Sequence, residues 1–242
     1  MSETAVNRKR YSESTRFGRL PATVSIPIRE PGSALTHFAG LILMAIGAGP
    51  LIMRASIYGS VRTVIGVIVF VLTSCMLYAA STVYHSVVLD LKHTTLFRKL
   101  DHVSISVMIA GTYTPICLTW LYDSVGRWLL AAIWALAVGG VILKMAWITC
   151  PKWLSSGIYI LMGWLCLFAL GPLLSALPAG AFGWLLAGGL FYSAGAVIYA
   201  LHPKKFDAKH IYFGSHEIFH VLIMLGTFCH YMVMFHYTAF IA

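Results

Sequence analysis

Residues 63–89 read TVIGVIVFVLTSCMLYAASTVYHSVVL, a stretch without a single Lys, Arg, Asp or Glu. A helix needs about 20 predominantly apolar residues to cross the hydrocarbon core of a bilayer, because it rises only about 1.5 Å per residue. This run is long enough to cross. It therefore predicts a transmembrane helix rather than a strand or a short core helix of a soluble domain.

Further apolar runs of similar length follow the same pattern along the chain. Their approximate limits are 33–53, 102–121, 128–148, 153–174, 181–201 and 212–240. The connections between them are short, which favours antiparallel neighbours in one compact bundle. We therefore predict an all-α, polytopic integral membrane protein. A seven-transmembrane helix bundle occupies residues 30–242, and a polar, basic tail occupies residues 1–29.

The composition of the whole chain supports a membrane protein. Of its 242 residues, 59% are hydrophobic and only 10% are charged, whereas soluble domains are about 25% charged. So few charges cannot cover a soluble surface, and a disordered chain would be far more polar. The net charge of +9 could indicate nucleic-acid binding. However, most basic residues lie between apolar runs, so we predict no nucleic-acid partner. Five cysteines without a CxxC pair indicate reduced packing residues.

The basic residues predict how the bundle is oriented. If the tail is cytoplasmic, fourteen of the seventeen Lys and Arg fall on the inner side, and only Arg54, Arg62 and Arg127 fall outside. Such a bias is the positive-inside pattern of membrane proteins. It predicts a cytoplasmic N-terminus, an outer C-terminus and a multi-pass protein of the plasma membrane. Lys144, near an inner helix end, is expected to snorkel toward the headgroups.

Ionisable residues inside the predicted spans are the candidates for function, because a charge in hydrocarbon is costly. Five of them fall near inner helix ends and should share one depth in the inner leaflet: His37, His85, Asp101, His216 and His220. Other histidines, such as His102 and His230, have no helpful spacing and are predicted to hydrogen-bond between helices.

The spacing of two histidines predicts a metal site. His216 and His220 are four residues apart, so they share one helical face about 6 Å apart and can hold one ion. A tetrahedral catalytic zinc takes three protein ligands and one water, and His85 is the natural third ligand. Ser81, one turn before His85, could orient that ligand or the bound solvent. Asp101 could hydrogen-bond the water or take its proton.

Two other interpretations of the same residues stay open. Residues 216–220 also fit HExxH, in which Glu217 would be the general base of an intramembrane zinc metalloprotease. Alternatively, the histidines only hydrogen-bond across helices and hold the bundle together.

The order of these residues along the chain resembles a known family. It is similar to the hemolysin III proteins and their relatives, the progestin and adipoQ receptors (PAQR), which include the adiponectin receptors. The first family motif is an acidic residue, then Asn, then x3-His. Here it is matched by Glu30 and His37, with Ser33 in place of the usual Asn.

The other two family motifs are present as well. Ser81-x3-His85, followed by Asp101, matches the second motif, and His216-x3-His220 in the last span matches the third. The resemblance runs from about residue 30 to the C-terminus and does not cover the tail. It implies a seven-helix fold with zinc on the three matching histidines and Asp101 near the zinc-bound water. Some eukaryotic relatives are linked to hydrolysis of ceramide-type lipid amides, and bacterial members to membrane homeostasis. The resemblance implies a bacterial-type member, located in the bacterial inner membrane.

These observations lead to one main functional hypothesis and three alternatives. The main hypothesis is a ceramidase-like, zinc-dependent lipid-amide hydrolase, or a membrane-homeostasis protein of this family, with membrane lipids as partners. The alternatives are a non-enzymatic sensor or receptor with structural zinc, the metalloprotease using Glu217, and a cytolysin, which only the family name suggests. Because Glu217 is not one of the family motif residues, the resemblance favours a function other than proteolysis.

Overall fold

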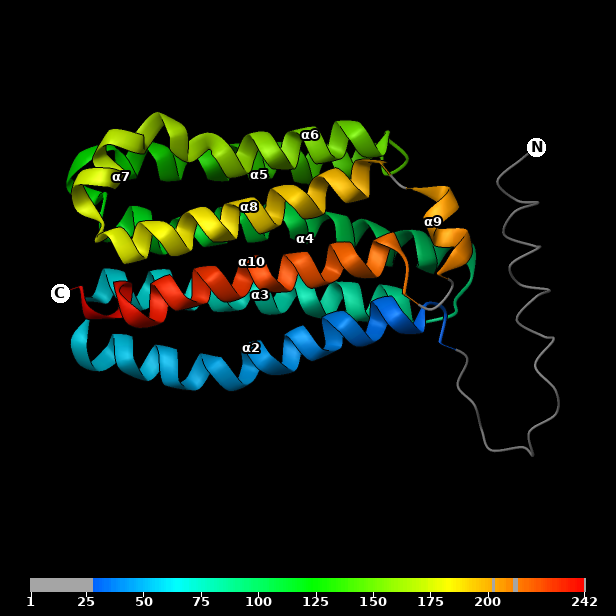
Figure 1. Cartoon of the computed structure of the whole chain (residues 1–242), viewed down its shortest axis with the longest axis horizontal. Coiled ribbons are helices and arrows are strands. Elements are labelled where there is room, and N and C mark those ends of the chain that lie inside the picture. The colour runs from blue at the N-terminus through cyan, green and yellow to red at the C-terminus, as the bar shows by residue number, and fades with distance from the viewer. Residues whose placement is uncertain (1–27, 202, 211–212, 242) are drawn as a thin grey trace.

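The computed structural model describes residues 28–201, 203–210 and 213–241. The described residues contain helices and connections but no strand, and the long helices run side by side as one bundle (Figure 1). This confirms the predicted all-α fold. The predicted tail, residues 1–29, lies outside the described residues except for its last two positions.

The helices follow one another with short connections. Their bounds are α2 (Pro31–Tyr58), α3 (Val61–Ser86), α4 (Leu91–Leu118), α5 (Arg127–Ala146), α6 (Lys152–Gly163), α7 (Leu170–Ala176), α8 (Ala179–Leu201), α9 (Lys204–Lys209) and α10 (Ser215–His236). A π-helical turn precedes α5, a 3₁₀ segment joins α6 to α7, and a last 3₁₀ turn spans Thr238–Phe240.

Six helical segments of the described chain are long and apolar enough to cross a membrane. Their bounds are Pro31–Tyr58, Val61–Ser86, Tyr122–Ala146, Lys152–Ala176, Ala179–Leu201 and Ser215–Phe240. Helix α4 is not among them, although it is equally long and packs between α3 and α5. Its sequence is less apolar because it carries the charged residues Lys92, Arg98, Lys99 and Asp101. It also carries buried hydroxyl side chains, including Ser104, Ser106, Thr112 and Thr114.

The outer surface of the bundle is apolar. Large side chains along its length are exposed, among them Leu43 at 64%, Ile46 at 68% and Phe168 at 86%. Soluble monomers rarely expose so much contiguous apolar surface. Lipid chains would cover this surface, so the chain is a multi-pass membrane protein.

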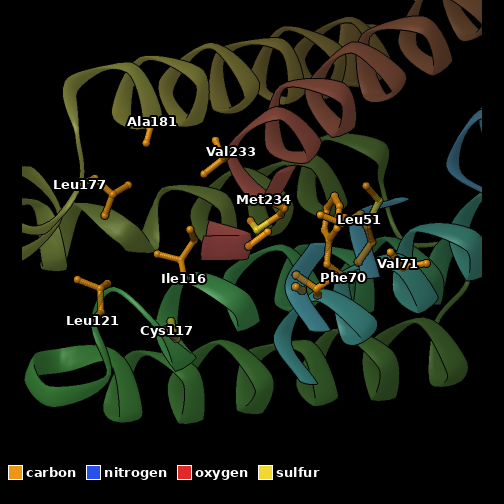
Figure 2. Packing of buried hydrophobic residues seen from close by; sticks show 14 of the residues in the cluster. Leu51, Phe70, Val71, Ile116, Cys117, Leu121, Leu177, Ala181, Val233 and Met234 are labelled. Carbon is orange, nitrogen blue, oxygen red and sulfur yellow. The ribbon is translucent and has the colours of Figure 1, made fainter. Parts of the chain in front are cut away.

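A large apolar core fills the end of the bundle that holds the last turn of the chain. Figure 2 shows Leu51, Phe70 and Met234, from α2, α3 and α10, pointing toward one another. All three are essentially without solvent exposure. At this end Thr63 Oγ1 donates to Ile241 O at 2.6 Å, which fastens the chain end to the start of α3.

Helices approach closely at one glycine of each of two adjacent pairs, Gly139-Gly140 on α5 and Gly188-Gly189 on α8. A Cβ on Gly140 would lie 2.5 Å from Ser106 Oγ on α4, and one on Gly188 would lie 2.4 Å from a ring nitrogen on α10. Gly139 and Gly189 face open space, with nothing within 4 Å. Gly140 and Gly188 therefore lie at close contacts between helices, whereas Gly139 and Gly189 do not.

The start of α4 differs from the sequence-based boundary. The apolar pattern predicts a helix from residue 102, with Lys92 and Lys99 in a loop, but α4 begins at Leu91. Asp90 caps it by accepting a hydrogen bond from His93 N at 3.1 Å. A carboxylate at this position stabilises a helix start, so the polar residues continue as helix.

The expectation that Lys144 snorkels is wrong. Its side chain is buried, with 3% exposure. Its Nζ donates to Ser155 Oγ at 2.5 Å and to Cys150 Sγ at 3.1 Å. The amine turns inward because the start of α6 offers polar partners there, and hydropathy along one helix cannot show them.

Candidate metal centre

A cavity of about 1040 Å³ opens inside the bundle, between α3, α4, α6, α8 and α10. Apolar side chains such as Ile105, Leu173 and Ile223 line much of it. Ionisable residues gather where α3 ends and α2 and α10 begin. The cavity therefore joins a polar end to an apolar interior.

Three histidines meet at the polar end. His85 lies in the last turn of α3, and His216 and His220 lie in the first two turns of α10. One ring nitrogen of each lies within 4.8 Å of the others, so together they could hold a metal ion. The Nε2 atoms of His85 and His216 are 3.3 Å apart. The prediction that these three residues converge is confirmed.

The ring of His85 is oriented by a carboxylate. Its Nδ1 donates to Glu30 Oε2 at 2.5 Å, which leaves Nε2 as the electron-pair donor facing His216. Burial would raise the pKa of the Glu30 carboxyl. The hydrogen bond and charge of His85, together with the charges of Arg29 and His216, outweigh burial and lower this pKa to about 2. Glu30 is therefore a carboxylate under ordinary conditions.

Hydrogen bonds orient the ring of His220 as well. Its Nδ1 donates to Ser33 O at 3.2 Å and lies 3.1 Å from Thr36 Oγ1. This arrangement leaves Nε2 of His220 free to bind an ion. The ring of His37 stacks on that of His220, with centroids 3.6 Å apart and planes 8° apart.

The donor set fits a metal that prefers imidazole. A tetrahedral zinc with bonds of about 2.0–2.1 Å places its ligand nitrogens about 3.4 Å apart, close to the observed 3.3 Å between His85 and His216. In His85 and His220, the ring nitrogen that would not bind the metal forms a hydrogen bond with an oxygen, as is usual for metal-binding histidines.

Asp101 and Ser81 line the same cavity beside the histidines. Ser81 lies one turn before His85 on α3, close enough to interact with Asp101 of α4. The Ser81 hydroxyl is buried and forms no close hydrogen bond with any described residue. The pair is thus placed where a water or a polar substrate group would find partners. The predicted catalytic roles of both residues stay predictions.

Glu217 has structural partners on both carboxylate oxygens. Its Oε1 accepts from Ser33 Oγ at 2.5 Å, and its Oε2 accepts from Gly214 N at 2.9 Å. The side chain therefore caps α10 and ties it to α2, as a capping-box Glu does. This arrangement favours a structural role over that of a protease base.

The remaining histidines do not form the predicted hydrogen bonds between helices. His230 Nδ1 donates to Gly226 O of its own helix at 2.9 Å. The side-chain nitrogens of His37 and the Nδ1 of His102 have no hydrogen-bond partner among the described residues. His37 and His102 line the cavity instead.

Spacing along the sequence does not identify two of the residues that orient the ligands, Glu30 and Thr36. Glu30 matches a family motif, but the motif by itself gives this residue no role. The available signal is an acidic side chain directly before an apolar run, where a charge is unusual.

Fold and site together define a class: a polytopic helical membrane protein with a three-histidine centre at one end of an internal cavity. The family comparison agrees. A model of the family described as "Haemolysin-III related" matches residues 26–231, and the chain belongs to that family. The resemblance inferred from the motifs is confirmed.

Named relatives support the same assignment. The chain is 37% identical to Hemolysin-3 of Bacillus cereus over 198 residues, covering 82% of this chain and 86% of that protein. It is 33% identical to the Hemolysin-3 homolog of Bacillus subtilis, covering 82% and 89%. It is 28% identical to the adiponectin receptor protein of Drosophila melanogaster, covering 84% of this chain and 49% of that receptor.

Proposed function

We propose that the chain crosses a bacterial plasma membrane seven times, with its N-terminus cytoplasmic and α4 as one of the spans. Two structural relationships support this topology. The residue before α2 is joined to the last turn of α3, because Glu30 N donates to His85 O at 2.9 Å. The other end of α2 lies by the last turn of the chain. The first and last described residues therefore lie at opposite ends of the bundle. An odd number of crossings follows if each long segment spans once. The excess of basic residues on one side then fixes the orientation.

The function that the site supports best is hydrolysis of a lipid amide with zinc as cofactor. The observation that carries this proposal is the convergence of three histidine donors at the polar end of a large, mostly apolar cavity. A bound zinc would polarise a carbonyl and lower the pKa of a water toward ~7. The apolar wall would receive the acyl chain from the bilayer.

We assign roles to the protein's own residues from the cavity that they line. Asp101 would accept a proton from the attacking water and pass it to the leaving amine. The buried hydroxyl of Ser81, near Asp101, would orient that water or the substrate carbonyl. Glu30 holds the His85 ring in the metal-binding tautomer.

The decisive experiment measures metal content and turnover in the same preparation. The purified full chain is analysed for bound elements and then incubated with a panel of N-acyl lipids, with release of fatty acid followed by mass spectrometry. We expect about one zinc per chain and release that stops on chelation. Full zinc occupancy without turnover on a broad panel would overturn the hydrolase.

A non-enzymatic sensor with a structural metal is the second candidate. The observation that favours it is that the three histidines come from two different helices, so a metal there would tie α3 and α10 together. Glu30, before α2, already binds one of these ligands. In that case a folded, metal-loaded Asp101→Ala variant would keep the cellular phenotype. Loss of the phenotype in that variant would support the hydrolase instead.

The cytolysin alternative rests only on the name shared by the family and its Bacillus relatives. Leakage of dye from vesicles that hold the purified protein tests it directly. We expect no leakage above that of vesicles with an unrelated membrane protein.

A further inference from the structure

Three basic side chains line the cavity at the end that holds the histidines, although none of them belongs to the metal centre. They are Arg29, two residues before α2, Arg98 of α4 and Lys152, the first residue of α6. They come from three separate segments. The fold has therefore assembled them, because no local sequence pattern does.

Aromatic rings contact two of these three cations. The Arg29 guanidinium carbon lies 3.9 Å from the centroid of the Tyr84 ring, and Lys152 Nζ lies 4.9 Å from that of Tyr199. Arg98 is within electrostatic range of both rings and of Lys152. Cation–π contacts of this kind position a cation without neutralising it.

Carboxylates balance part of the charge of this cluster: Asp207 lines the same cavity, and the charges of Asp207 and Glu30 act on Lys152. However, neither Arg98 nor Lys152 forms a salt bridge of 4.0 Å or less with a carboxylate of the described residues. Arg29 Nε is 3.6 Å from Glu30 Oε1, but the other oxygen of Glu30 already binds His85.

The guanidinium of Arg29 also has unused donors. Its Nε and Nη2 are buried and have no hydrogen-bond partner among the described residues. A buried donor without an acceptor costs free energy, about 1–3 kcal/mol and more for a charged group. An anion in the cavity would satisfy these donors.

We propose that Arg29, Arg98 and Lys152 bind the phosphate or carboxylate of an anionic lipid whose acyl chain lies in the apolar part of the cavity. Guanidinium groups suit both anions because they can donate two parallel hydrogen bonds. The inference rests on the proposed function for its view of the cavity as a lipid site. It narrows the substrate class to a lipid amide that also carries an acidic group on its head.

The test measures lipid binding and does not depend on turnover. The full chain is titrated, by native mass spectrometry and thermal shift, with phosphatidylglycerol and with phosphatidylcholine of the same acyl chains. Inorganic phosphate forms a separate arm. We expect preference for phosphatidylglycerol, and a loss of about tenfold or more in its affinity in Arg98→Gln/Lys152→Gln. If the double variant does not fold, the same titration is made with Lys152→Gln alone.

Lys92→Gln is the matched control. Lys92 lies on α4 like Arg98, but it is exposed and does not line the cavity. Lys92→Gln removes one positive charge, as Lys152→Gln does, and should leave phosphatidylglycerol affinity unchanged. Equal loss in this control, or unchanged binding in the double variant, would overturn the site. If inorganic phosphate binds as tightly as phosphatidylglycerol, the site binds a free anion and not a lipid headgroup.

The result also separates this inference from the proposed function. Metal content is measured in every variant, and titrations are repeated after chelation. If metal stays bound and anionic lipid is not preferred, only the headgroup site fails. If no metal is bound but the preference depends on Arg98 and Lys152, only the proposed metal function fails.

Discussion

Glu30 Oε2 lies 2.5 Å from His85 Nδ1, and the backbone N of Glu30 donates to His85 O at 2.9 Å. The residue before α2 thus holds both the ring and the main chain of the last turn of α3. The end of one helix and the start of another are fixed by the same pair that orients a metal ligand. Metal binding and the packing of α2 against α3 are therefore expected to depend on each other.

Glu30→Gln should weaken metal binding about 10–100-fold, because the carboxylate that orients His85 and makes its ring a better donor is lost. Competition with a chromogenic chelator measures the affinity. Glu217→Gln is the matched control, since Glu217 caps α10 and contacts no ligand ring through a hydrogen bond. It should keep both metal and activity. Loss of activity with metal retained in Glu217→Gln would revive the metalloprotease.

Asp101→Asn should reduce turnover about 10²–10⁴-fold, because the group placed to transfer protons is lost, while zinc content stays unchanged. Steady-state hydrolysis and elemental analysis of the same sample measure both. Asp90→Asn removes a carboxylate at the exposed start of the same helix and should leave turnover intact. Equal activity in the Asp101 variant would remove its proposed role.

Removing the metal should lower the melting temperature. A ligand present at about 1,000 times its dissociation constant stabilises the folded state by about 4 kcal/mol. Thermal unfolding with and without chelator measures the shift. His85→Ala should abolish the response to chelator. His230→Ala should retain it, because His230 bonds to its own helix. A chelator response that survives in His85→Ala would place the metal elsewhere.

Gly66→Ala should destabilise the contact between α3 and α4. The added Cβ would lie 2.6 Å from the Cα of Pro115, a backbone atom that cannot move away by a rotamer change. Overpacking of this kind costs about 1–3 kcal/mol, which a drop in melting temperature reports. Gly139→Ala adds the same methyl group where nothing lies within 4 Å. An equal drop in both variants would contradict the packing explanation.

Ser155→Ala should destabilise the bundle by about 1–3 kcal/mol, because it leaves the buried Lys144 Nζ with one hydrogen-bond partner fewer. The comparison is Ser175→Ala, an exposed serine bonded only to its own helix at Gly171 O. Melting temperatures of the two variants should differ clearly. No difference would show that Lys144 finds another partner.

Much of the site can be predicted from the sequence. The i, i+4 spacing of His216 and His220 depends on helix geometry alone, and the depth of His85 in the membrane places this third ligand at their level. Depth says nothing about helix rotation, however, so Glu30 cannot be predicted as the partner of His85. The burial of Lys144 escapes prediction for the same reason.

The sequence alone determined that the chain is a helical membrane protein, because a backbone in hydrocarbon must form its hydrogen bonds within each segment. Run length and hydropathy suffice to show this. Only the tertiary structure decided which faces of the helices meet. Lipid and neighbouring helices are equally apolar, so hydropathy cannot distinguish a lipid-facing side from a packed one. The partners of Glu30, Glu217 and Lys144 therefore follow from shape and from a few hydrogen bonds between helices.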